Sequence, residues 1–282
     1  MSEPVTAAKC GALLDALRVK KPLVHFITNY VTVNDCANIT LAVGGAPVMS
    51  DQPDDAAEIC RLASALVFNI GTPGDRTLEA MLRAGKAANE AGIPVVLDPV
   101  GAGASSFRNR LLEKLLEEVK FAAVKGNISE IRFLASGTGK SMGVDASKDD
   151  IALGSDSSAV ARLAAGLSRG IGAVVIVSGR IDVAADGERA YGISNGDAMM
   201  GRLTGTGCMG SGVVASFLGA APGEPLASAI AGMCVMGLAG LARKKLAPSS
   251  GTGTYRTILM DEVSCMTGSV LENGVRLSQI VL

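Results

Sequence analysis

A glycine-punctuated segment, TGTGCMG at residues 204–210, carries the sharpest chemical signal in the sequence. It stands near the start of an uncharged stretch of helical length. Closely spaced glycines let successive backbone N–H groups converge on one point, and the N-terminus of a helix adds positive potential there. The segment therefore predicts an anion-binding site, with Gly205 and Gly207 in its wall, that suits a phosphoryl group during transfer. Its G-x-G-x-x-G spacing also matches a dinucleotide fingerprint, but a second long helix follows where a Rossmann unit needs a parallel strand.

Cys208 directly follows the second of these glycines. The positive end of a helix favours a thiolate, so this sulfur is a candidate to orient or deprotonate a substrate hydroxyl. The alternative is a small side chain that packs beneath the loop. The other cysteines are scattered without a C-x-x-C pair, which argues against a zinc site, and we expect buried free thiols at Cys10, Cys36, Cys60, Cys234 and Cys265.

Polar side chains stand at the ends of several apolar runs of strand length. Asp98 lies near the end of the run at 93–99, and Lys125 near the end of the run at 121–126. Because ligands bind beyond the carboxyl ends of strands in an open parallel sheet, both residues are candidates for one site. Asp98 could hold a magnesium ion through water, and Lys125 could reach phosphate oxygens. The alternative for Asp98 is a turn-forming or helix-capping role.

Asn127 and Glu130 follow Lys125 and lie three residues apart, so they share one face of a helix that begins there. With Lys125 they could form a corner that binds phosphate and magnesium, but the same spacing also fits a capping box. Ser178 ends the run at 173–178, where its hydroxyl could bind a nucleotide phosphate or stabilise a turn. These residues predict a phosphate site and leave a structural alternative open at each position.

Asn29 and Met49 stand at the ends of the first two apolar runs. Either could line the pocket of an acceptor substrate, because a thioether is a good neighbour for a flat, polarisable ring. Packing in the core is the alternative for both. His25, the single histidine, lies inside the first run, which favours a structural role with satisfied hydrogen bonds over a catalytic one.

The elements that must position these residues alternate along most of the chain. Apolar runs lie at 23–27, 46–49, 65–70, 93–99, 121–126 and 173–178. Helical patterns lie at 54–63, 75–91, 105–120, 155–168 and about 257–273. Because several runs are apolar on both faces, the alternation predicts an α/β protein, a three-layer α/β/α sandwich with a mostly parallel central sheet. Two-residue periodicity on either side of Gly187 predicts a hairpin that adds a small antiparallel edge.

Composition excludes several functional classes. The 26 basic and 27 acidic residues give a net charge of −1, so no basic surface is predicted for nucleic acid or anionic lipid. With 48% hydrophobic residues and no linker, we expect one domain over residues 1–282. Uncharged stretches at 203–223 and 225–242 are rich in small residues, which favours buried helices over a membrane hairpin. The start lacks a signal-peptide pattern, so a cytoplasmic protein is expected, and the polar insertion at 136–150 is a flexible flap or a solvated connection.

Eight segments occur in this order: PLVHFITNYVTVNDCAN, LAVGGAPVMSD, NIGTP, VLDPVGAGAS, KGNISEI, DGERAYGISNGDAMM, LTGTGC and GTGTYR. In type and order they resemble the hydroxyethylthiazole kinase family, thiamine-salvage enzymes of the ribokinase-like superfamily. The pairing of ITN with GTGC is the specific part, since most ribokinase-like kinases have aspartate where Cys208 stands. The resemblance implies a homotrimer that uses ATP and Mg²⁺ to phosphorylate the primary alcohol of 4-methyl-5-(2-hydroxyethyl)thiazole.

The resemblance also implies roles for individual residues. Met49 and Gly205 match residues of the thiazole pocket. Asn127 and Glu130 match the N-x-x-E magnesium motif of the superfamily. Cys208 stands at the position of the catalytic base. These roles agree with the chemistry inferred above from the residues themselves.

At the ATP site the sequence departs from the family pattern. Lys125 and Ser178 fall on ATP-binding positions, beside Gly207, but the family usually has arginine and threonine there. Lysine keeps the charge and loses the bidentate fork of arginine. Arg180 stands where the family typically has glutamate, which reverses a charge beside the nucleotide. Two alternatives stay open: a kinase for another small alcohol, such as a hydroxymethylpyrimidine or a sugar, and a nucleotide-binding protein without turnover.

Overall fold

The computed structural model describes residues 3–137, 154 and 156–282, and in this part of the chain the strands form one nine-stranded sheet. The strand order is β2-β1-β3-β4-β5-β6-β7-β8-β9. Its parallel strands are β1 (Leu23–Ile27), β2 (Ala46–Met49), β3 (Ala65–Asn69), β4 (Val95–Asp98), β5 (Ala123–Asn127) and β6 (Val174–Ser178). Its antiparallel strands are β7 (Asp182–Ala185), β8 (Ala190–Ile193) and β9 (Leu277–Ile280).

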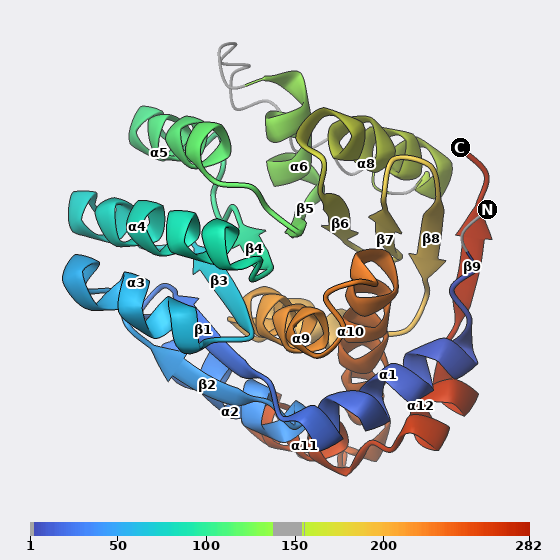
Figure 1. Cartoon of the computed structure of the whole chain (residues 1–282). Coiled ribbons are helices and arrows are strands. Elements are labelled where there is room, and N and C mark those ends of the chain that lie inside the picture. Colours follow the sequence, from blue (N-terminus) through green and yellow to red (C-terminus); the bar gives the residue numbers. More distant parts are fainter. Residues whose placement is uncertain (1–2, 138–153, 155) are drawn as a thin grey trace.

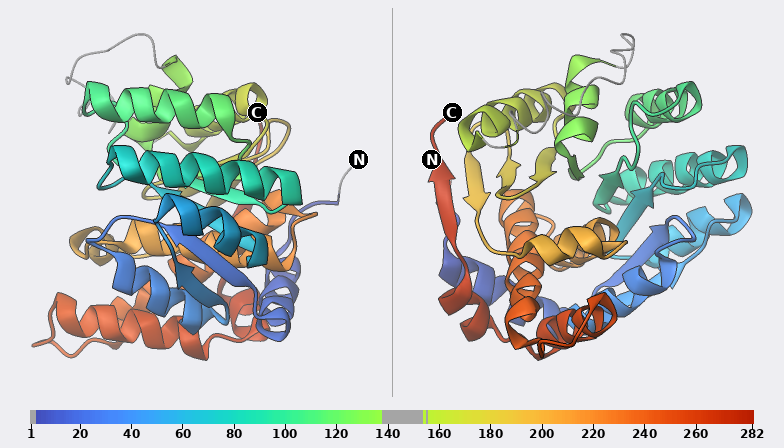
Figure 2. Two further views of the ribbon diagram at one scale, coloured as in Figure 1. Left: turned by 60° about the vertical axis from the view of Figure 1, so that its left-hand side comes forward. Right: turned by 180° about the vertical axis from the view of Figure 1, so that it is seen from behind.

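Helices cover both faces of this sheet (Figures 1 and 2). One face carries α3 (Pro53–Leu62), α4 (Asp75–Ala91), α5 (Ser106–Glu118), α6 (Ile128–Ser136) and α8 (Ser157–Ile171). The other carries α1 (Ala7–Lys20), α2 (Val33–Val43), α9 (Thr206–Ala220), α10 (Pro225–Gly240), α11 (Thr252–Cys265) and α12 (Gly268–Gly274). Strand side chains alternate between two cores, so that Val96 faces the second group while Val95 and Leu97 face the first. The predicted three-layer α/β/α sandwich is therefore confirmed.

The predicted pair of uncharged core helices corresponds to α9 and α10. The segment from Pro225 to Lys245 is long and apolar enough to cross a membrane, yet 83% of its apolar window is buried inside the protein. The two helices pack backbone against backbone, because a Cβ at Gly232 of α10 would lie 2.9 Å from Cα of Val214 in α9. Small residues thus allow the close approach of α9 and α10.

Most predicted elements agree with the structure, but the last predicted helix does not. The last predicted helix, 257–273, is two helices, since α11 ends at Cys265 and Thr267 caps the start of α12 with its side chain. Cys265, at that end of α11, is exposed rather than buried. The prediction also missed α1, α2 and β9, three elements near the chain ends.

The predicted hairpin around Gly187 is the β7–β8 pair. Strand β9 then pairs with β8, so the hairpin lies inside the sheet and β9 forms the edge. The polar insertion predicted at 136–150 lies mainly outside the described residues, as does the predicted start of the helix at 155–168. Within the described part, that helix is α8.

Candidate active site

Two cavities open at the carboxyl edge of the parallel strands. The first, here called the carboxylate cavity, has a volume of about 340 Å³ and is lined by residues that include Asn29, Asp98, Asn127, Glu130, Gly205 and Cys208. The second, called the methionine cavity, measures about 490 Å³ and is lined by Met200, Met233 and Met236 among others. Lys125, Ser178 and Gly207 line both cavities. The structure thus brings nearly all of the predicted site residues to one region.

The start of α9 forms one wall of the carboxylate cavity. Gly205 is its N-cap residue with φ +89°, a left-handed conformation that favours glycine. A Cβ at this position would lie 2.9 Å from Cγ2 of Thr32, so space and backbone both exclude a larger side chain. The N–H groups of a first helical turn have no carbonyl partner within the helix. The geometry therefore suits the predicted anion site.

Cys208 lies in the first turn of α9 and is half-buried. Its Sγ accepts hydrogen bonds from two side-chain amides, from Nδ2 of Asn69 at 3.2 Å and from Nδ2 of Asn29 at 3.5 Å. The thiol also lines the carboxylate cavity. It can therefore meet a bound molecule, unlike Cys10, Cys36, Cys60 and Cys234, which are buried as predicted.

Asp98 ends β4 and is buried, with 3% of its surface exposed. Its Oδ2 accepts hydrogen bonds from Nδ2 of Asn69 at 2.9 Å and from Oγ of Ser211 at 2.8 Å. Burial raises the pKa of Asp98, while the Lys125 ammonium and these two donors oppose that rise. Because burial destabilises the ionised form of this carboxyl, a cation bound nearby would stabilise that form.

Asn127 and Glu130 form the capping box that their spacing also allowed. Oδ1 of Asn127 accepts from the amide of Glu130 at 3.0 Å, and Oε2 of Glu130 accepts from the amide of Asn127 at 2.8 Å. Oε1 of Glu130 accepts from the amide of Gly101 at 2.9 Å. Burial raises the pKa of Glu130 against these amides. Both side chains line the carboxylate cavity while they cap α6, so the capping role leaves their predicted functional role possible in space.

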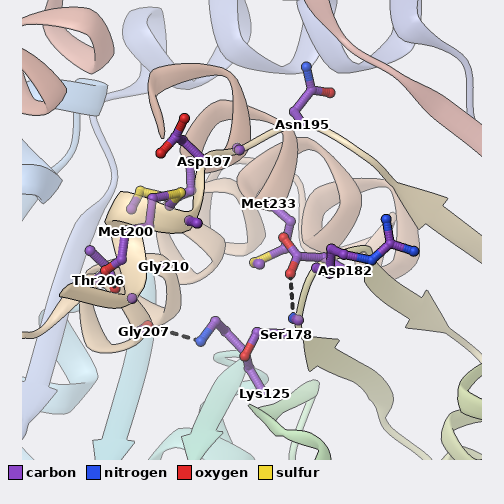
Figure 3. A pocket seen from close by; sticks show the side chains of 17 residues that line it. Lys125, Ser178, Asp182, Asn195, Asp197, Met200, Thr206, Gly207, Gly210 and Met233 are labelled. Carbon is purple, nitrogen blue, oxygen red and sulfur yellow. Dashed lines mark hydrogen bonds between the residues drawn. The ribbon is translucent and has the colours of Figure 1, made fainter. Parts of the chain in front are cut away.

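Lys125 lies between the two cavities with 2% of its surface exposed. Its Nζ donates a hydrogen bond of 3.0 Å to the carbonyl of Gly207, as Figure 3 shows. This bond ties β5 to the first turn of α9. Oγ of Ser178 donates to the carbonyl of Gly126 at 3.3 Å. The ammonium and this hydroxyl thus stand where the cavities meet.

The methionine cavity combines apolar walls with four charged residues. Besides Lys125, these are Arg180, Asp182 and Asp197. Arg180 is exposed and forms no ion pair with another residue of the described chain. Oδ1 of Asp182 accepts from the amide of Gly179 at 2.9 Å, and burial raises the pKa of Asp182 to about 6 (Figure 3). An apolar pocket with a few polar groups is the usual form of a small-molecule site.

Met49 differs from the other candidates. It ends β2, is half-buried, and packs against the core on the α9 side of the sheet. It is absent from the linings of both cavities. His25 is fully buried and its Nε2 bonds to the carbonyl of Ser50 at 2.8 Å, as a structural histidine does, although its Nδ1 has no partner.

Three residues of the site were missed in the sequence. Asn69 and Ser211 contact Asp98, and Asp182 lines the methionine cavity. Asn69 ends an apolar strand run, the same signal that identified Asp98. Asp182 begins a strand of the predicted hairpin, and no local pattern distinguishes it. Ser211 lies inside α9, a helix of small residues, and only the tertiary packing reveals that its partner is Asp98.

The donor set for a metal consists of oxygen atoms. The described residues contain no cluster of three or more His, Cys, Asp or Glu side chains that could hold an ion. Asp98 and Glu130 nevertheless line one cavity, and burial raises the pKa of each. Mg²⁺ is commonly held by one or two carboxylates, with waters and phosphate oxygens as its other ligands. The residues present therefore fit Mg²⁺ accompanied by a phosphate ligand.

Comparisons with known proteins identify the relatives of this chain. The sequence model of the Hydroxyethylthiazole kinase family matches residues 14–269. A hydroxyethylthiazole kinase from Ruminiclostridium cellulolyticum is 46% identical over 268 residues, which cover 95% of this chain and 96% of that protein. The solved hydroxyethylthiazole kinase of Pyrococcus horikoshii is similar with a TM-score of 0.83 and 32% identity, over 96% of this chain and 99% of that one.

A ribokinase-like superfamily protein from Enterococcus faecalis shares the fold, with a TM-score of 0.58 and 10% identity over 93% of this chain and 90% of that one. The chain therefore has a fold of the ribokinase-like class. Within that class, the chain belongs to the hydroxyethylthiazole kinase family.

Proposed function

We propose that this chain transfers the γ-phosphoryl group of ATP to the primary alcohol of 4-methyl-5-(2-hydroxyethyl)thiazole, a step of thiamine salvage. The observation that carries the proposal is the carboxylate cavity. In it the first turn of α9 shares one lining with two carboxylates, the buried Asp98 and the half-buried Glu130, and with the half-buried thiol of Cys208. Such a site can hold a transferring phosphoryl group beside a hydroxyl.

Each substrate has a cavity of suitable chemistry. The methionine cavity, with its thioether and apolar walls, suits the nucleoside of ATP. Lys125, Ser178 and Gly207 lie where the phosphates would pass into the carboxylate cavity, and Asn127 lies beyond them. Asn29, Gly205 and Cys208 border the remaining space, which would take the alcohol. For Met49 the family match alone supports a role in the thiazole pocket.

Asp98 and Glu130 are the residues that would hold Mg²⁺, with Asp98 acting through water. When bound, the ion would neutralise charge on the phosphate oxygens. The chain's own cation at this point is Lys125, which Gly207 holds at the junction of the cavities. Its ammonium would also balance phosphate charge, because it lines both cavities.

In the transfer step, the alcohol oxygen forms a bond to the γ-phosphorus as the bond to the β-phosphate oxygen breaks and ADP leaves. The hydroxyl proton passes to Sγ of Cys208 in its thiolate form, which becomes a thiol. The amides at Gly205 to Cys208 would hold the moving phosphoryl oxygens. A thiol matches the acidity of an alcohol poorly, so we expect positioning to supply most of the acceleration and the base about 10²-fold.

An ADP-release assay tests the proposal. With ATP and MgCl₂, the thiazole alcohol should give ADP and an equal amount of phosphorylated alcohol by mass spectrometry. A parallel panel of a hydroxymethylpyrimidine and simple sugars tests the alternative kinase. Faster turnover of a panel alcohol would replace the proposed acceptor, and ATP binding without turnover of any alcohol would favour a non-catalytic protein.

The family match also supports a homotrimer in the cytoplasm. Tyr30 and Val31 are 78% and 59% exposed directly after Asn29, so an apolar surface lies beside the carboxylate cavity. A neighbouring subunit on this surface would border the acceptor. Light scattering of the purified protein should give three times the chain mass of 28.5 kDa. A monomer mass would contradict this part of the proposal.

A further inference from the structure

Asn69, at the end of β3, joins the two chemical halves of the carboxylate cavity. Its Nδ2 lies 2.9 Å from Oδ2 of Asp98 and 3.2 Å from Sγ of Cys208. The side chain is 3% exposed, and its Oδ1 accepts from the amide of Gly71 at 2.9 Å. One buried amide therefore connects strand β4, the loop after β3 and the first turn of α9.

The orientation of this amide follows from its partners. The backbone N–H of Gly71 can only donate, so it requires the oxygen of Asn69. The Asp98 carboxylate accepts hydrogen bonds, so it requires the NH₂ group. Asn69 therefore presents a donor to Cys208, and an exchanged arrangement would lose both bonds.

Asn29 is oriented in the same way. Its Oδ1 accepts from both the amide and the hydroxyl of Thr32, each at 3.1 Å, and its Nδ2 donates to Oδ1 of Asn69 at 2.8 Å. The remaining contact of its NH₂ group is Sγ of Cys208 at 3.5 Å. The side-chain amides of Asn29 and Asn69 thus both donate to Sγ of Cys208, which accepts on the side that faces them.

We propose that Asn69 is a positioning residue for Cys208, one that holds the sulfur as an acceptor and links it to Asp98. The inference rests on the proposed function only for its effect on turnover. The two NH₂ groups would stabilise a thiolate at Cys208. If the thiol is neutral, they direct its hydrogen away from the amides.

Alkylation of the free protein tests the contact without any substrate. Iodoacetamide reacts with thiolates, and peptide mass spectrometry resolves each cysteine. In Asn69→Ala we expect alkylation of Cys208 at pH 7.5 to slow by about tenfold, the effect of one lost hydrogen bond to a charged acceptor. The exposed Cys265 is an internal reference whose rate should not change. Equal rates at Cys208 in both proteins would overturn the proposal.

Ser211→Ala is the matched control. Like Asn69, Ser211 donates to Oδ2 of Asp98, but no contact joins it to Cys208 among the described hydrogen bonds. We expect the alkylation rate of Cys208 in this variant to stay within twofold of the parent protein. A slowing equal to that of Asn69→Ala would show an effect through Asp98 alone, against the proposal. Asn69→Ser replaces Asn69→Ala if thermal melting shows that the alanine variant is unfolded.

Turnover provides the second readout through a double-mutant cycle. Asn69→Ala should lower kcat about tenfold with the KM for ATP within twofold, and it should lower kcat no further in a Cys208→Ala background. An equal loss in both backgrounds contradicts the positioning role. If the parent protein phosphorylates no alcohol, the proposed function fails while the alkylation contrast still decides whether Asn69 acts on the sulfur.

Discussion

Substitution of Gly205 by valine should damage catalysis more than removal of the Cys208 thiol. Gly205 has φ +89°, which costs an L-residue about 1 to 2 kcal/mol. Its new Cβ would lie 2.9 Å from Cγ2 and 3.3 Å from Cβ of Thr32, an overpacking that costs about 1 to 3 kcal/mol. The start of α9 must move to relieve this contact, and the amides that we propose to hold the phosphoryl group move with it.

The loss of one such amide typically costs 10² to 10³ in rate. We therefore expect Gly205→Val to lower kcat/KM about 10³-fold, and Cys208→Ala to lower it about 10²-fold. The assay is ADP release with saturating MgCl₂, and circular dichroism melts establish that each variant is folded at the assay temperature.

Gly172→Val is the control for backbone strain. Gly172 has φ +68° at the C-cap of α8, and a Cβ there meets no atom within 4 Å. This variant should lose stability from the same conformational cost and keep its kcat/KM within twofold. The reasoning is refuted if Gly205→Val retains more than a tenth of the parent kcat/KM, or if Cys208→Ala is the more damaging change.

Three further predictions follow from the charged residues. Burial raises the pKa of Asp182 from 3.8 to about 6, so between these pH values the folded state keeps a proton that the unfolded chain has released. Above pH 6 the carboxyl is ionised in both states, and its burial destabilises the fold. Asp182→Asn should therefore raise the free energy of unfolding in urea by at most about 3 kcal/mol at pH 8, with no gain at pH 4. Arg180→Glu should raise the KM for ATP about three- to tenfold with kcat unchanged, because the exposed guanidinium lines the methionine cavity and would attract the phosphates. The increase in KM should be smaller in 0.5 M KCl, which screens this attraction. An unchanged KM would show that Arg180 does not face the phosphates. Asp98→Asn should lower kcat/KM about 10- to 100-fold and raise the MgCl₂ concentration for half-maximal rate, and an unaltered magnesium dependence would remove Asp98 from the metal site.

Much of the fold could be predicted because parallel strands covered on both faces are apolar throughout. The helix α1 was missed although Cys10, Leu13, Leu14 and Leu17 have helical spacing and are buried. The helix α2 is harder, since its valines, isoleucine and threonine have low helix propensity and its packing against α9 and α11 decides its conformation.

The candidate site was predictable in part for a similar reason. Asp98, Asn127 and Ser178 end strands and Lys125 lies two residues before the end of β5, and the carboxyl ends of neighbouring parallel strands meet at one edge. The contacts that join such residues to one another gave no signal in the sequence. The bonds of Asn69 to Asp98 and Cys208 span 29 and 139 residues of sequence, and only the tertiary fold reveals them.

The close approach of α10 to α9 has a consequence far from either cavity. An added methyl group at Gly232 would press on the main chain of Val214. Because α9 is rigid, it would transmit that displacement along its axis to its N-terminus. Inactivating substitutions in a random library should therefore include conservative Gly-to-Ala changes deep in the interior, at sites that no substrate ever touches.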